Sequence, residues 1–159
     1  MAAEHPFDSY VREYVCDDPG GIDVGRAALL FALDAYPNLS VSEYLGFLDE
    51  LAERVVAEAG RREVSVPIRW AALRRVLVEQ VGLTGQVEPS YDPQDCHLNQ
   101  VLDSRRGLPV SFSCIWIAVG RRVGWRICGL AMPEHFAVCI DGPDGRLFAD
   151  PACNGLLLN

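Results

Sequence analysis

Apolar side chains recur at helical spacing through the first half of the chain and in short alternating runs through its last third. This change of period predicts a helical part over residues 1–85, followed by a core over residues 86–159 that contains strands. The chain has 159 residues, so we expect both parts to form a single domain. The helices that we expect in the first part span residues 7–15, 24–35, 41–59 and 67–81.

Several residues in this first part are typical of helix ends. Asp23 is a good N-cap for the helix over 24–35. Ser40 and Glu43 have the spacing of a capping box at the start of the next helix. Gly60 and Gly82 follow the last periodic residues of their helices, as a left-handed C-terminal glycine does.

The second part begins with two predicted helices. We expect Asp95 to cap a short helix over 96–105, and Gly107 to take the left-handed conformation after it. Pro109 fits the first position of a helix that continues over 110–123 and is apolar on nearly every side. Such a helix is normally buried, although its first residues also alternate as a strand does.

Three strands are predicted after this helix, over residues 125–131, 135–140 and 146–150. Residues 141–145, Asp-Gly-Pro-Asp-Gly, are a strong turn signal between the last two strands. Helices followed by an antiparallel hairpin predict an α+β fold.

Composition narrows the functional classes. The formal charge of −8 argues against a nucleic-acid surface. We expect no membrane segment and no signal peptide, and therefore a cytoplasmic protein, because no apolar run is long enough for either and the first residues carry no basic cluster. The six cysteines form no C-x-x-C pair, so we expect reduced thiols, no metal and no cofactor.

One pair of residues in the predicted hairpin indicates chemistry. His135 opens one strand and Asp150 closes the next, so the two can face each other across the pair. A carboxylate in this position orients an imidazole for acid–base catalysis. The chain contains no evident nucleophile beside them.

A buried helix followed by a histidine strand and an aspartate strand resembles the transglutaminase-like superfamily, which shares its core with papain-like peptidases. The resemblance implies a cysteine at the start of the central helix, activated by the histidine that the aspartate holds. Helices packed on a small antiparallel sheet are the fold that it implies.

The SirB-type bacterial branch of that superfamily is similar in more detail, and related domains occur in some eukaryotic F-box proteins. The matching residues are Tyr91-Asp92-Pro93, Leu98-Asn99, Arg105-Arg106-Gly107, Pro109, Ser111, Gly124, Pro133-Glu134-His135-Phe136 and Asp150-Pro151. The helices over 24–35, with Ala27-Ala28-Leu29, and over 41–59 resemble the N-terminal helical part of that branch, so the resemblance spans most of the chain.

Three features depart from the superfamily's pattern. The place of the nucleophilic cysteine falls near Pro109, as in the branch as a whole, and Glu134 stands where the branch usually has glycine. Family members usually continue well past Asp-Pro, so we expect this chain to be a fragment that lacks a C-terminal helical region.

Two residues are candidates to replace the missing cysteine. Ser111 lies in the first turn of the central helix, and Cys114 lies on the same face one turn later. The simpler interpretations are a hydroxyl bonded to backbone and an inert core thiol. Cys96 and His97 are adjacent, but we expect their side chains to point apart.

Binding residues are harder to predict from the sequence. Asn99, Arg105 and Arg106 are candidates for ligand binding. Arg105 and Arg106 could hold an anionic ligand at the helix start, and Asn99 could cap or tie the loop to the site. The alternative is a structural asparagine with a solvated arginine pair.

Two main functional hypotheses follow. The domain is either a non-catalytic or divergent module that binds a protein or small molecule, or an acyl-transfer or hydrolytic enzyme that uses His135 and Asp150 with Ser111 or Cys114. A purely structural module of a longer protein is the third hypothesis. The sequence leaves the partner and the oligomeric state open.

Overall fold

The computed structural model describes residue 6, residues 21–85, 92–133 and 136–158, and the backbone of His135. The predicted helix over 7–15 lies outside these described residues, as do Tyr91 and Glu134. The elements are α2 Val24–Phe31, η1 Ala32–Asp34, α3 Val41–Ala59, α4 Val66–Arg74, η2 Arg75–Gln80, η3 Pro93–Cys96, α5 Leu98–Ser104, α6 Pro109–Val123, β1 Arg126–Met132, β2 His135–Gly142, β3 Gly145–Asp150, η4 Pro151–Cys153 and β4 Leu156–Leu158.

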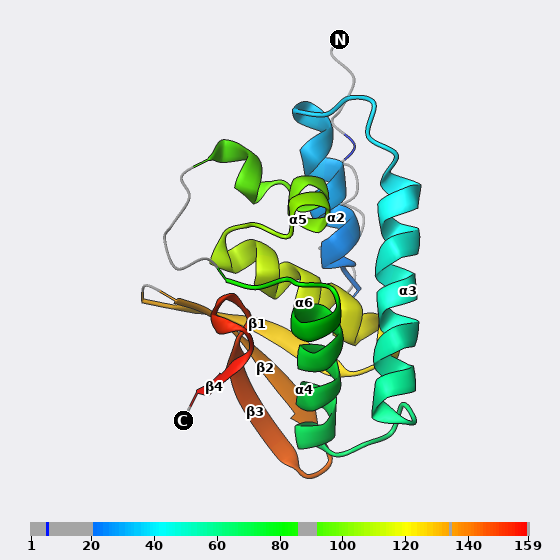
Figure 1. Cartoon of the computed structure of the whole chain (residues 1–159), viewed down its shortest axis with the longest axis vertical. Helices are drawn as coiled ribbons and strands as arrows, with labels where there is room; N and C mark the ends of the chain where they lie inside the picture. Colours follow the sequence, from blue (N-terminus) through cyan, green and yellow to red (C-terminus); the bar gives the residue numbers. More distant parts are fainter. Residues whose placement is uncertain (1–5, 7–20, 86–91, 134, 159) are drawn as a thin grey trace.

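The architecture confirms the predicted α+β class, with helices packed on a four-stranded antiparallel sheet (Figure 1). The sheet order is β1-β2-β3-β4, so each strand pairs with the next along the chain. Helix α6 contacts α2 and α3 as well as β1 and β2. No helix in the described part of the chain is both long enough and apolar enough to cross a bilayer.

Helix α6 is the buried element that its sequence predicts. Every residue from Ser111 to Gly120 is buried except the half-buried Cys114. Pro109 begins the helix, and Gly124 ends it in the left-handed conformation at φ 94°. Helix α6 is apolar on nearly every side, and this explains its place between other elements. Packing on each side removes apolar surface from water, which is favourable.

The helix ends in the first part agree with the predictions at three positions out of four. The Asp23 side chain accepts hydrogen bonds from Gly25 N and Arg26 N, as an N-cap does. Gly60 and Gly82 have φ of 80° and 83°. The predicted capping box at Ser40 is wrong, because this N-cap side chain makes no capping hydrogen bond.

Two further predictions, around α5, are also wrong. Asp92 caps the short η3 turn, and α5 begins only at Leu98. Arg105, not Gly107, takes the left-handed conformation after α5, at φ 64°. Gly107 has a different role, which is to allow the close approach of the Val101 side chain. A Cβ at position 107 would lie 2.8 Å from Val101 side-chain atoms.

The third predicted helix is present as α4 followed by the π-helical η2. Two of its apolar residues, Ile68 and Ala71, are exposed, while Arg69 is buried. The Arg69 guanidinium donates to Val64 O at 2.9 Å and to Asp141 O at 2.7 Å. A buried arginine is tolerated where backbone carbonyls accept its hydrogen bonds.

The three predicted strands are observed with ends that differ by one or two residues. The sheet's inner face carries Ile127, Val138, Ile140 and Ala149, which belong to the hydrophobic core. Side chains alternate along a strand, so the residues between them point to the opposite, outer face. The sequence pattern missed β4, a strand of three residues that pairs with β3.

Candidate functional site

The N-terminus of α6 is where the resemblance places a nucleophile. Pro109 is the first residue of α6, and the preceding Leu108 is its N-cap in an extended conformation. Proline suits this position because its nitrogen carries no hydrogen and its φ is already helical. The residue at the expected cysteine position therefore has a structural reason to be proline.

The hydroxyls of the next turn are engaged with backbone. Ser111 is buried, and its Oγ donates to Asp95 O at 3.2 Å. Ser113 is also buried, and its Oγ donates to Phe136 O at 3.1 Å. These bonds tie the start of α6 to η3 and to β2, which is a structural role.

The thiol of Cys114 lies deeper in the same helix. Burial raises its pKa, so the thiol stays protonated at neutral pH. An activated cysteine shows the opposite shift, because a cation, a metal or a helix N-terminus stabilises the thiolate.

Asp150 has a structural role in the described residues. It is only 4% exposed, and its Oδ1 accepts hydrogen bonds from Ala152 N at 2.9 Å and from Cys153 N at 3.2 Å. The carboxylate therefore caps η4.

His135 is the first residue of β2 and lies opposite Met132 of β1. The β2–β3 register pairs Val138 with Ala149, so its continuation brings Asp150 across from Ala137. The backbones of His135 and Asp150 thus lie on adjacent antiparallel strands. The His135 side chain lies outside the described residues, and its pairing with Asp150 stays a prediction.

The three candidate binding residues lie between α5 and α6 or within α5. Asn99 is buried, and its Oδ1 has no hydrogen-bond partner. Arg105 lies 5.5 Å above the Phe47 ring, and its Nη1 is buried without a partner. Arg106 is exposed, and its backbone N donates to Ser104 Oγ at 3.2 Å. A ligand site made of these three residues, with an anion held by the two arginines, stays a prediction.

Arg105 also lines a cavity of about 410 Å³, whose other lining residues include Glu43, Tyr44 and Asp103. Tyr44 donates its hydroxyl to Asp103 Oδ2 at 2.6 Å. Burial, this hydrogen bond and the nearby negative charges together raise the pKa of Tyr44 to about 12. The phenol therefore stays neutral near physiological pH and holds the Asp103 carboxylate in place.

The side chains of Cys96 and His97 do not point apart, so that expectation is wrong. Cys96 Sγ lies 3.7 Å from His97 Nδ1 and donates to Pro93 O at 2.8 Å. The imidazole contacts two aromatic rings, stacking on Phe31 and meeting Tyr36 edge-on. The ring is therefore held mainly by packing.

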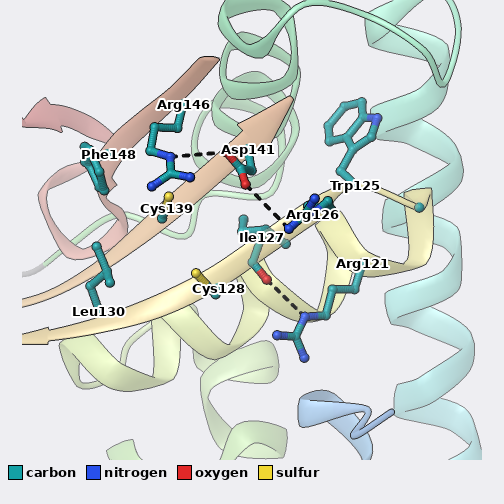
Figure 2. Close-up of a pocket in the computed structure, with 11 residues that line it drawn as sticks. Arg121, Trp125, Arg126, Ile127, Cys128, Leu130, Cys139, Asp141, Arg146 and Phe148 are labelled. Carbon is teal, nitrogen blue, oxygen red and sulfur yellow. Dashed lines mark hydrogen bonds and ion pairs between the residues drawn. The ribbon is translucent and has the colours of Figure 1, made fainter. Parts of the chain in front are cut away.

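The outer face of the sheet carries a groove of about 580 Å³ that our sequence analysis missed (Figure 2). Arg126 and Arg146 flank Asp141 there, at 3.9 Å and 3.3 Å, and Phe148 and Leu130 line the same groove. The signal was present in the alternation of the strands, since each of these side chains occupies an outward position of its strand.

Comparison with known proteins gives a consistent result. The sequence profile of a family described as "Transglutaminase-like superfamily" matches residues 42–159 of this chain. A UPF0162 protein of Xylella fastidiosa is 37% identical over 129 residues, which cover 80% of this chain and 45% of the relative. A UPF0162 protein of Pseudomonas aeruginosa is 30% identical over 140 residues, covering 84% and 51%.

A shorter match joins the chain to a eukaryotic protein. F-box only protein 21 of Mus musculus is 31% identical over 65 residues, which cover 41% of this chain and 10% of that protein. No solved structure matches. The chain spans about half the length of the bacterial relatives.

The matched residues 42–159 include α6 and the whole sheet, the elements that define the resemblance. By this match and by its α+β architecture, the chain belongs to the transglutaminase-like superfamily.

Proposed function

We propose that this domain is a cytoplasmic, non-catalytic member of the superfamily, in its SirB-type branch, and that it binds a ligand without transforming it. The observation that carries this proposal is the chemistry at the start of α6. Proline stands in the expected nucleophile position, and the nearest hydroxyls, Ser111 and Ser113, donate to backbone carbonyls. On this view His135 and Asp150 are a remnant of the catalytic arrangement.

The enzyme alternative requires changes in these contacts. Ser111 would have to release Asp95 O before its hydroxyl reached a base. Cys114 would have to ionise although burial raises its pKa. Each requirement adds a cost to the reaction, because a nucleophile must first be deprotonated.

The groove on the outer face of the sheet is the surface that we assign to the ligand. Arg126 and Arg146 are 87% and 62% exposed in their side chains and line the same groove as the aromatic ring of Phe148. Among the described residues that line the groove, Asp141 is their single acidic neighbour. An excess of guanidinium groups on a chain of net charge −8 favours an anionic ligand with an apolar part.

The non-catalytic proposal predicts no acyl transfer. Neither the natural chain nor Pro109→Cys is expected to incorporate a fluorescent amine into a glutamine-bearing test protein, with or without calcium. The substitution adds a thiol at position 109 but leaves its surroundings unchanged. The neighbouring hydroxyls of Ser111 and Ser113 remain bonded to backbone carbonyls. Turnover by the natural chain that is lost in His135→Ala would overturn the proposal in favour of a substitute nucleophile.

The binding proposal predicts where a simple probe attaches. Titration with an aromatic carboxylate, naphthoate, should shift amide NMR signals of β1 and β3 around Arg126, Arg146 and Phe148. Arg146→Glu should weaken this binding by about tenfold or more, because it replaces an ion pair by like-charge repulsion.

Arg75→Glu is the matched control, since it makes the same charge change on an arginine that is paired with Glu58 on the helical side of the molecule. It should bind naphthoate as the natural chain does. Equal weakening in both variants, or shifts confined to the start of α6, would contradict the assignment of the groove.

A further inference from the structure

Two cysteines face each other across the first two strands of the sheet. The register of β1 and β2 places Cys128 directly opposite Cys139. Their neighbours Ile127 and Ile140 are also opposite each other and belong to the hydrophobic core. Alternation therefore places both thiols on the outer face, and Figure 2 shows their sulfur atoms on that side of the neighbouring strands.

This position matches the geometry of a disulfide bond. Residues directly opposite in an antiparallel pair have Cα atoms about 4.5 or 5.5 Å apart, depending on whether the pair is hydrogen-bonded. Disulfides join Cα atoms about 4.4–6.8 Å apart. Both kinds of pair fall within that range, so the backbone separation of the two residues is compatible with the bond. Both cysteines are free thiols in this structure.

The two thiols differ in access. Cys128 is exposed, whereas Cys139 is buried. Burial and the neighbouring Cys128 thiol raise the pKa of Cys139, while the Arg146 guanidinium opposes them. An external reagent therefore meets Cys128 first, and Cys139 is placed to react second.

The surroundings of the pair select the charge of the reagent. Both thiols line the groove that also contains Arg121, Arg126 and Arg146, and Asp141 is the one acidic group in the part of its lining that the structure describes. Arginine side chains attract anions. A small disulfide that carries carboxylates suits this groove better than a neutral one.

We propose that Cys128 and Cys139 form a thiol–disulfide exchange site whose oxidant is a small anionic disulfide of the glutathione type. The Cys128 thiolate attacks one sulfur of that disulfide, which forms a mixed disulfide and releases one thiol. The Cys139 thiolate then attacks Cys128 Sγ, which forms the cross-strand bond and releases the second thiol. Two electrons and two protons pass to the oxidant, and the protein loses two hydrogens.

The other described cysteines lack this arrangement. Cys96 and Cys153 are exposed, and Cys114 is half-buried within α6. None of the three stands opposite another cysteine in the strand registers. They serve as internal controls for the reactivity of an unpaired thiol on the same chain.

The test uses the full chain, reduced and folded, incubated with oxidised glutathione, quenched by alkylation and mapped by peptide mass spectrometry. We expect a Cys128–Cys139 bond and no retained glutathione on either residue. Cys139→Ser should stop after the first step and retain glutathione on Cys128. Cys128→Ser, a change at an exposed position, should leave Cys139 unmodified. Cys153→Ser should form the Cys128–Cys139 bond as the natural chain does.

Two further experiments test separately the role of the strand register and the charge of the oxidant. In concentrated urea the preference for the Cys128–Cys139 bond over bonds to Cys153 should disappear, because the strand register is lost. Bis(2-hydroxyethyl) disulfide, which is neutral, should react several-fold more slowly than oxidised glutathione, and Arg146→Glu should reduce that difference.

The proposal is overturned if the folded chain links other cysteines as fast as this pair, or if Cys139→Ser retains no more glutathione on Cys128 than on Cys96. Equal rates for the two disulfides would overturn the anionic class of the oxidant. The pairing of the thiols needs neither catalysis nor ligand binding by the domain, so loss of the naphthoate shifts would leave it standing.

Discussion

Replacing Trp116 by alanine is expected to lower the free energy of unfolding by about 3–5 kcal/mol. Trp116 is fully buried on α6. The edge of its ring lies under Gly155, where a Cβ would come within 2.8 Å of Cη2. Truncation therefore leaves a cavity between the central helix and the segment that leads into β4, and the rigid surroundings can fill it only in part.

Urea unfolding followed by circular dichroism measures this loss. Ile68→Ala is the control, because Ile68 is 45% exposed on α4 and its loss should change stability by no more than about 1 kcal/mol. Trp116→Phe should cost less than Trp116→Ala, since it keeps most of the ring and removes an indole N–H that is buried without a partner. A loss in Trp116→Ala no larger than that of Ile68→Ala would contradict the central place of α6 in the core.

The second large effect is expected at Arg122, whose replacement by alanine should cost about 3 kcal/mol. The side chain is 15% exposed near the end of α6, and its Nη2 lies 2.6 Å from Asp23 Oδ2. Its Nε lies 2.8 Å from Asp49 Oδ1, and its Nη1 donates to Ala118 O. The same Asp23 carboxylate caps α2, so Arg122 joins α2 and α3 to the end of α6.

Two comparisons make this prediction specific. Arg75→Ala removes the more exposed ion pair with Glu58 and should cost no more than about 1 kcal/mol. Asp23→Ala combined with Arg122→Ala should cost clearly less than the sum of the single changes, because the two residues share one interaction. Additive losses, or a loss in Arg122→Ala equal to that in Arg75→Ala, would show that the contact contributes little.

The elements that carry the site could be predicted because their signals are local. The run of apolar residues after Pro109 predicts a buried helix, and the structure has α6 from Pro109 to Val123. The turn signal over residues 141–145 predicts the β2–β3 hairpin, which is observed. Pro109 at the helix start could be anticipated for the same reason, since proline fits the first turn by its own geometry.

Positions that depend on more distant partners could not be predicted in this way. The capping interpretation of Asp95 is wrong, because Asp95 lies within the η3 turn and α5 begins only at Leu98, after His97. The Asp95 backbone carbonyl accepts the Ser111 hydroxyl from 16 residues further along the chain. Arg69 is buried because Asp141, 72 residues away, offers it a carbonyl. Arg105 adopts a left-handed backbone beside the Phe47 ring of another helix. These partners are distant in sequence, so the periodicity of apolar residues within one element does not reveal them.

The sequence by itself therefore determined the fold class, the central helix, three of the four strands and the proline at the start of α6. These features follow from helical periodicity, strand alternation and residue geometry, which act over a few residues. Only the tertiary structure decided how the hydroxyls of Ser111 and Ser113 are bonded, and that Cys128 stands opposite Cys139. Such contacts depend on strand register and on the packing of distant segments, where a shift of one residue would turn every outward side chain to the other face.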